Sequence, residues 1–162
     1  MKKIFINSEW AVAFTGHRFV PFGKQREVEV KLSKAIREHY QRGCRDFLCG
    51  MAIGFDMFAA EAVINLKKEL PQIRLIAVVP YRGQCERWNI VLQNKYNKLL
   101  NQADRIIILS EYYFNGCMLR RNDFMLENAD HVITFFSGKA EGGTYYTTKK
   151  ARAFNKQVTN IY

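Results

Sequence analysis

The stretch Cys49-Gly50-Met51-Ala52-Ile53-Gly54-Phe55-Asp56 decides how this chain folds. An apolar run over 46–49 enters the first glycine, and the second glycine opens a segment, 55–70, whose apolar residues recur at helical spacing. A strand that turns through two glycines into a helix presents backbone N–H groups and the positive helix end to a ligand, with no side chain in the way. The stretch therefore predicts a strand–helix unit with a phosphate site at its turn.

A second glycine turn lies near the end of the chain. The apolar residues 134–136 precede Glu141-Gly142-Gly143-Thr144, which opens another helical stretch. Two glycine turns at strand ends favour a nucleotide-type ligand. The residues expected to contact it in these turns are Gly50, Gly54, Gly142, Gly143 and Thr144.

Strand and helix patterns alternate along the whole chain. Strands are predicted at 11–15, 45–49, 73–79, 105–110, 131–136 and 158–162, and helices at 23–41, 55–70, 88–102, 118–128 and 144–155. Apolar strands separated by helices imply a parallel sheet covered on both faces. We therefore predict an α/β fold, a Rossmann-like three-layer sandwich with a mainly parallel sheet, as a single domain over 1–162.

Composition narrows the class of protein. The 162 residues are 48% hydrophobic and 14% aromatic, as in a globular protein with a proper core. No apolar run approaches the roughly 20 residues of a membrane span, and the start of the chain lacks the apolar centre of a signal peptide. The four cysteines show neither paired spacing nor ligand spacing with the three histidines. We expect a cytoplasmic protein without membrane, metal or cofactor.

The loop Thr15-Gly16-His17-Arg18 follows the first predicted strand, where ligands bind in doubly wound sheets. Its glycine permits a tight turn, and Arg18 can clamp a phosphate. The alternatives are that Arg18 is simply solvated and that His17 caps a helix or packs on Phe19.

Three further positions are candidates for contacts to sugar or base. Asp56 falls in the first turn of a predicted helix, where a carboxylate either caps the helix or binds a ribose hydroxyl. In the loop 80–88, Gln84 can hydrogen-bond a base and Trp88 can stack on one. The alternative for Trp88 is that it anchors the loop on the core.

The helix predicted at 118–128 carries an arginine on its inner side. Its apolar stripe places Asn122 on the buried face with Arg121 beside it, whereas Arg120 projects to the opposite side. An arginine that leans toward the sheet is costly unless it meets an anion or a carboxylate. Arg121 is therefore the expected phosphate ligand, and a structural pair with Glu127 or Asp130 is the alternative.

The formal charge of +10 favours anionic partners. Part of it gathers on the last predicted helix, without an acid between the cations Lys149, Lys150, Arg152 and Lys156. Aromatic residues interleaved with the cations, as nucleic-acid binders often have, are missing there. A solvated basic surface and a weak nucleic-acid surface both stay open.

The glycine stretch resembles the serine-glycine-x-alanine-x-glycine-isoleucine-aspartate segment of the DNA-processing proteins called DprA or Smf. Arg121-x-x-x-Met125-x-x-x-Ala129-Asp130 and Glu141-Gly-Gly-Thr144 resemble motifs of the LOG phosphoribohydrolases. Both families belong to the SLOG superfamily, whose fold is Rossmann-like. The Pro80-aromatic-x-x-Gln84-x-x-x-Trp88 pattern, the Tyr96…Gln102-Ala103-Asp104 segment and Asn122 resemble its YpsA-like branch.

The resemblance implies a nucleotide-related pocket, and homodimers are common in the superfamily. One departure argues against hydrolysis, because Thr147 stands where the LOG enzymes carry a glutamate. We therefore expect a binding or sensor domain for a nucleotide or a derivative such as ADP-ribose or NAD, with no catalytic residue assigned. The alternatives are an N-glycoside hydrolase acting on nucleoside monophosphates and a DprA-like binder of single-stranded DNA.

Overall fold

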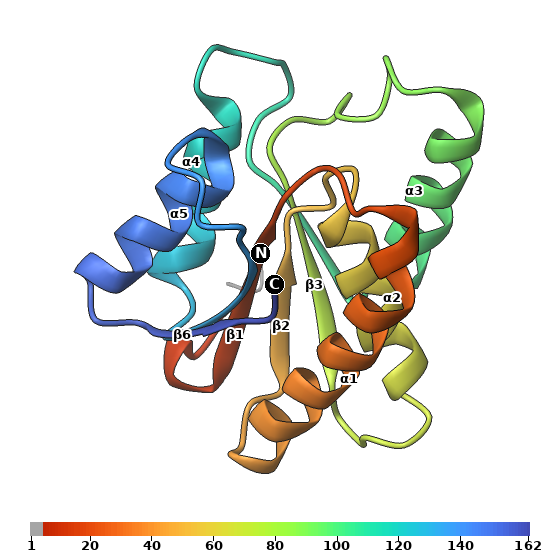
Figure 1. The fold of residues 1–162 in the computed structure, drawn as a ribbon. Helices are drawn as coiled ribbons and strands as arrows, with labels where there is room; N and C mark the ends of the chain where they lie inside the picture. Colours follow the sequence, from red (N-terminus) through yellow and green to blue (C-terminus); the bar gives the residue numbers. More distant parts are fainter. Residues whose placement is uncertain (1–4) are drawn as a thin grey trace.

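A computed structural model describes residues 5–162 as a single sheet flanked by helices (Figure 1). The strands are β1 (Ala11–Gly16), β2 (Asp46–Cys49), β3 (Arg74–Val79), β4 (Arg105–Ile108), β5 (His131–Phe135) and β6 (Gln157–Asn160). The helices are α1 (Gln25–Gln41), α2 (Phe55–Leu66), α3 (Ile90–Gln102), α4 (Cys117–Glu127) and α5 (Gly142–Ala153), with 3-10 turns η1 (Ser8–Trp10) and η2 (Phe22–Lys24).

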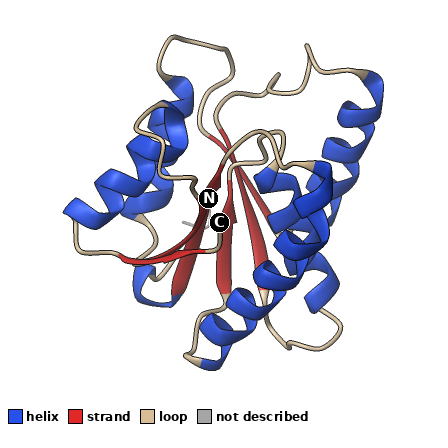
Figure 2. Cartoon of the chain, viewed as in Figure 1, coloured by secondary structure: helices blue, strands red, loops and turns tan. Residues whose placement is uncertain are grey.

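All neighbouring strands pair in parallel, in the order β4-β3-β2-β1-β5-β6. Helices α1, α2 and α3 cover one face of the sheet, and α4 and α5 cover the other (Figure 2). This confirms the predicted Rossmann-like three-layer fold. The strand order reverses direction at the boundary between β1 and β5, so these two strands open a crevice at their carboxyl ends.

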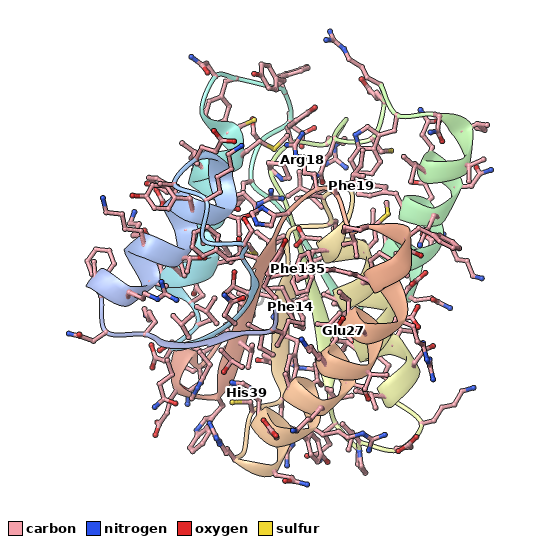
Figure 3. The ribbon with its side chains drawn as sticks, viewed as in Figure 1. Phe14, Arg18, Phe19, Glu27, His39 and Phe135 are labelled. Carbon is pink, nitrogen blue, oxygen red and sulfur yellow. The ribbon has the colours of Figure 1, made fainter. Side chains whose placement is uncertain are left out.

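The core lies mainly between the sheet and the first three helices. Fully buried aromatic rings fill it, with Phe14 stacked on Phe47 at 5.9 Å and Phe55 stacked on Phe135 at 5.7 Å between ring centroids. Figure 3 shows Phe14 and Phe135 beneath the end of the sheet that bears Arg18 and Phe19. Buried aromatic packing of this kind fixes the strands on which the loops are mounted.

Several predicted boundaries were wrong by a few residues. Helix α2 ends at Leu66 and not at residue 70, and residues 67–70 continue as turns and a bend up to Pro71. Helix α3 begins at Ile90 and not at residue 88, because the Asn89 side chain accepts a hydrogen bond from the Leu92 N–H at 2.9 Å and caps the helix.

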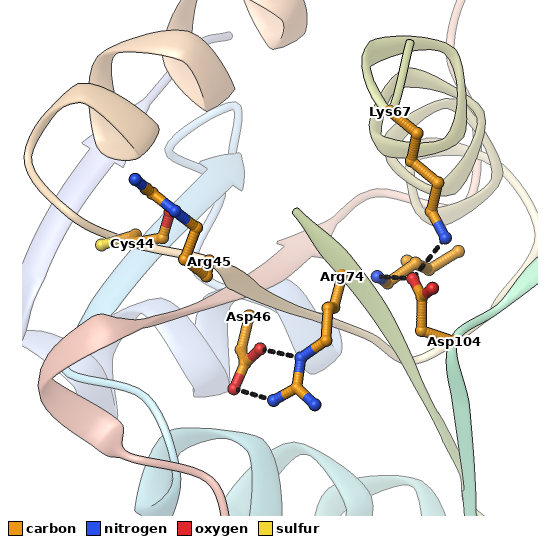
Figure 4. A network of polar contacts seen from close by, with 7 residues as sticks. Cys44, Arg45, Asp46, Lys67, Arg74 and Asp104 are labelled. Atoms are coloured by element: carbon orange, nitrogen blue, oxygen red, sulfur yellow. Dashed lines mark hydrogen bonds and ion pairs between the residues drawn. The ribbon is translucent and has the colours of Figure 1, made fainter. Parts of the chain in front are cut away.

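A polar network joins the amino ends of the central strands, at the end of the sheet opposite to the crevice (Figure 4). Asp46 at the start of β2 accepts two hydrogen bonds from Arg74 at the start of β3, at 2.7 and 2.8 Å. Asp104 accepts a hydrogen bond from the Leu75 N–H at 2.7 Å and pairs with Lys67 of the segment after α2. The bidentate pair joins two residues that face each other in the register of β2 and β3, and so supports that register.

His39 makes the stability of the fold depend on pH. It is buried in α1, its Nδ1 lies 2.7 Å from the Ala35 carbonyl oxygen, and its ring meets that of His131 edge-on at 5.5 Å. Burial lowers the pKa of His39 below its ordinary value of 6.5. The unfolded chain therefore binds this proton more readily than the folded one, and stability present above about pH 6.5 falls as the solution becomes more acidic.

We expect the free energy of unfolding to decrease between pH 7 and pH 5, and to decrease less in His39→Gln. Urea titrations at several pH values measure both curves. Parallel curves for the two proteins would contradict the assignment to His39.

Candidate functional site

A cavity of about 440 Å³ opens at the crevice between the carboxyl ends of β1 and β5. Its walls come from the loop after β1, the turn into α2, one side of α4 and the first turn of α5. Four segments far apart in the sequence therefore meet at the position where doubly wound sheets bind their ligands.

The cavity brings most of the predicted site residues together. Those that line it are Thr15, Gly16, His17, Arg18, Asp56, Arg121, Gly142, Gly143 and Thr144. The wall also includes Asn122 and Glu141, which were not among the predicted contact residues. Sequence signals for both exist, because Asn122 follows Arg121 on the buried face of α4 and Glu141 begins the glycine turn.

The structure places Gly50, Gly54, Gln84 and Trp88 outside the lining. Gln84 is buried, its Nε2 donates to the Gly50 carbonyl at 3.2 Å and its Oε1 accepts from the Tyr96 hydroxyl at 3.4 Å. Trp88 packs edge-on against Tyr96, with 5.2 Å between ring centroids. The loop 80–88 thus holds the glycine turn through Gln84 and does not line the cavity, and Trp88 anchors the loop to the core.

Gly50 and Gly54 matter because other groups need the space beside them. A Cβ atom on Gly50 would lie 2.6 Å from the guanidinium carbon of Arg121. Gly54 has φ +89°, and its Cβ would lie 2.2 Å from the Arg18 carbonyl oxygen. The glycine turn therefore allows close packing by Arg121 and by the loop after β1, and any ligand lies beyond these groups.

Arg121 is the principal cation of the cavity wall. It is 4% exposed, its Nε donates to Asn122 Oδ1 at 2.8 Å, and its Nη1 donates to the Gly50 carbonyl oxygen. Within residues 5–162 it has no ion pair with a carboxylate, and Asp130 pairs instead with Lys156 at 3.0 Å. Burial lowers the pKa of Arg121, and the charge of Asp56 acts against that effect.

Asp56 is the buried carboxylate of the cavity. Its Oδ2 accepts a hydrogen bond from the Ala52 N–H at 3.1 Å, so it closes the glycine turn and does not cap its own helix. Burial raises the pKa of Asp56, whereas Arg121, the Ala52 N–H and Arg18 act in the opposite direction. The charge of Arg18 thus acts on both Asp56 and Arg121 across one small space.

His17 connects three loops of the site. Its backbone N–H donates to Phe135 at 3.3 Å, its carbonyl accepts from Phe55 at 3.1 Å, and its Nε2 accepts from the Ser137 N–H at 2.8 Å. Burial lowers the pKa of His17, which favours the neutral ring that this last hydrogen bond needs. The ring also lies 6.0 Å from that of Phe136 and does not cap a helix.

The first turn of α5 faces the same cavity. Glu141 is its N-cap residue, but no side chain caps the free N–H groups of Gly142, Gly143 and Thr144. Unpartnered N–H groups and the helix dipole together attract an anion. A phosphate in the cavity would thus meet Arg121 on one side and the start of α5 on another.

The predicted basic surface on the last helix is partly neutralised. Lys150 pairs with Asp123 of α4 at 2.7 Å, and Lys156 pairs with Asp130 at 3.0 Å. No acid stands between these cations along the chain, but the fold brings Asp123 of α4 and Asp130 of the segment after α4 beside two of them. Lys149 and Arg152 are the members of that cluster without an ion pair in the described part of the chain.

Comparison with known proteins identifies the family. A model for YpsA, described as the YspA SLOG family, matches residues 12–162. The chain belongs to the YspA SLOG family. This confirms the resemblance to the SLOG superfamily and its YpsA-like branch, and residues of both glycine turns fall inside the matched range.

A curated protein and two solved structures are similar to the chain along most of its length. A UPF0398 protein of Brevibacillus brevis is 26% identical over 157 residues, which covers 93% of this chain and 81% of that protein. Among solved structures, DNA processing protein A from Streptococcus pneumoniae has a TM-score of 0.66 at 18% identity, and the Helicobacter pylori protein has 0.63 at 21%. Each alignment covers 93% of this chain, but only 49% and 64% of those proteins.

Two absences within residues 5–162 bear on the kind of site. No three side chains of histidine, cysteine, aspartate or glutamate gather there as a metal centre would require. Among the helices of the same residues, none combines the length and apolar character needed to cross a membrane.

Proposed function

We propose that this chain is a binding domain for a nucleotide or nucleotide derivative, such as ADP-ribose or NAD, whose phosphate occupies the cavity between β1 and β5. The place of the cavity in the sheet supports this, as does the meeting of Arg18, Arg121 and the start of α5 around it. Membership of the SLOG superfamily supports a nucleotide-related ligand over other phosphate compounds.

The observation that carries the proposal is that Arg121 is buried without an ion pair in the described residues. A buried guanidinium is costly unless an anion balances it, and no described carboxylate forms an ion pair with it. Its Nε and Nη1 are fixed by hydrogen bonds, while its Nη2 has no partner within residues 5–162. A phosphate oxygen would accept from that group and balance the charge.

Hydrolysis of an N-glycosidic bond has weaker support. Two carboxylates line the cavity, Asp56 and Glu141, and Asp56 is engaged by the Ala52 N–H. Thr147, which replaces the glutamate expected from the LOG enzymes, is buried, and its hydroxyl has no hydrogen-bond partner in the described residues. We therefore assign no catalytic residue.

Single-stranded DNA is the second candidate ligand. The Helicobacter pylori relative in structure, DNA processing protein A, binds single-stranded DNA, and the net charge of +10 would attract a polyanion. The pairing of Lys150 with Asp123 and of Lys156 with Asp130 reduces the contribution of α5 and the segment after it to such a surface.

Salt dependence separates the two ligands. We expect binding of AMP, ADP-ribose or NAD to weaken only gently between about 50 and 200 mM salt, because each ligand carries only one or two phosphates. Single-stranded DNA, several of whose phosphates the protein would neutralise, would lose affinity with a log–log slope of about 0.7 per phosphate. Isothermal titration calorimetry with each nucleotide, and fluorescence anisotropy with a labelled oligonucleotide, measure the slopes. Tight oligonucleotide binding that survives salt, without binding of any nucleotide, would overturn the proposal.

A further inference from the structure

A second cavity, of about 370 Å³, adjoins the first. The two share His17, Glu141 and Gly142, so the loop after β1 and the start of α5 form the ridge between them. We propose that the second cavity receives the base of a nucleotide whose phosphate lies in the first. This inference rests on the proposed function and names the part of the ligand that gives it specificity.

Aromatic rings give the second cavity its chemistry. Phe19 is 75% exposed at its rim and contacts no other aromatic ring among residues 5–162. Tyr162 forms another wall and is held there, with its ring 4.8 Å from that of Phe135 and the Lys24 Nζ 4.5 Å from its centroid. The exposed Phe19 ring beside the Tyr162 wall offers a surface on which a planar group can stack. Every nucleobase has a π-face that stacks on an aromatic ring.

The ridge suits the sugar that joins a phosphate to a base. Gly142 has φ +84°, and a Cβ atom built on it meets nothing within 4 Å, so the ridge is bare at this residue. The Glu141 carboxylate beside it is exposed and pairs with Lys139 at 2.7 Å. A carboxylate accepts hydrogen bonds from two neighbouring hydroxyls, which a ribose offers. Phosphate, ribose and base would then lie in order across Arg121, Glu141 and Phe19.

Arg18 and Phe19 are consecutive, which links the two cavities through one loop. Figure 3 shows both residues beyond the carboxyl ends of the strands. Arg18 lines the first cavity and Phe19 lines the second. The segment that follows β1 would therefore contact both ends of the same nucleotide.

The test compares AMP with ribose 5-phosphate on the wild type, on Phe19→Ala and on Phe22→Ala. Phe22 is the matched control, because it is 89% exposed, lies three residues away and lines neither cavity. We expect Phe19→Ala to weaken AMP binding about 10-fold, the effect of losing one base–aromatic stack, and to leave ribose 5-phosphate binding unchanged. Phe22→Ala should change neither affinity in calorimetry.

Ethenoadenosine monophosphate provides a second measurement. Its fluorescence is quenched when its base stacks on an aromatic ring, so we expect quenching by the wild type and by Phe22→Ala but not by Phe19→Ala. Equal AMP affinity in Phe19→Ala and the wild type, or equal losses for AMP and ribose 5-phosphate, would overturn the base site while leaving the phosphate site standing. If neither AMP nor ribose 5-phosphate bound to the wild type, the proposed function and this inference would both be overturned.

Discussion

Replacing Arg121 by methionine is expected to weaken binding of AMP or ADP-ribose about 100-fold. Methionine fills similar space on α4 but removes the buried charge and the N–H groups that would meet a phosphate. Hydrogen bonds to charged groups contribute about 1.5–3 kcal/mol each, and each 1.4 kcal/mol corresponds to a tenfold change in affinity. Calorimetry with each nucleotide measures the loss, and circular dichroism confirms that the variant is folded.

Arg120→Met is the matched control for this experiment. Arg120 is the adjacent residue of the same type, but it is exposed, lies 5.8 Å from the Phe114 ring centroid and does not line the cavity. We expect its nucleotide affinity to stay within a factor of two or so of the wild type, as for surface substitutions away from a site. Equal losses in the two variants would show that overall charge attracts the ligand, and equal retention would remove Arg121 from the site.

Gly54→Ala is expected to lower the free energy of unfolding by about 3 kcal/mol or more, or to prevent folding. Two effects add at this residue. Its backbone, with φ +89° and ψ −125°, is a conformation that almost only glycine adopts. The added Cβ would also collide with the Arg18 carbonyl oxygen, a backbone atom that cannot turn away. Urea-induced unfolding followed by circular dichroism measures the change.

Gly116→Ala is the comparison variant with positive φ but without a collision. Gly116 precedes α4 as Gly54 precedes α2, and it has φ +91°, but an added Cβ meets nothing within 4 Å. Its left-handed conformation costs another residue about 1–2 kcal/mol. A Gly54→Ala protein as stable as Gly116→Ala would mean that the loop after β1 yields easily, contrary to the packing described above.

The strand–helix alternation was predictable from the sequence because buried parallel strands are continuous apolar runs and the helices between them have period 3.6. The exact ends were not. The start of α3 depends on the Asn89 cap, a signal that can be read from sequence only once a helix is known to begin nearby. The 3-10 turn at Phe22–Lys24 replaced the predicted first turn of α1, directly after Pro21.

The gathering of Arg18, Arg121 and Gly142 at one cavity followed from topology, since loops after parallel strands meet at the same edge. The sequence did not predict that the Gln84 side chain points toward the core, because the sequence of a loop does not show which of its side chains are buried. Gln84 holds the Gly50 carbonyl from below, and Arg121 holds the same oxygen from the cavity side. Two side chains from distant segments that donate to one carbonyl oxygen can be recognised only in the folded structure.

The hydrogen bonds of His17 have a consequence for how fast a ligand would be captured. They join the loops after β1 and β5 to the start of α2 before any ligand arrives, so the entropy of ordering these loops is already lost on folding. A ligand that binds to such a preformed site does not require a slow rearrangement of these loops. Its association would then be limited by diffusion and orientation, and its residence time would carry the differences in affinity between one nucleotide and another.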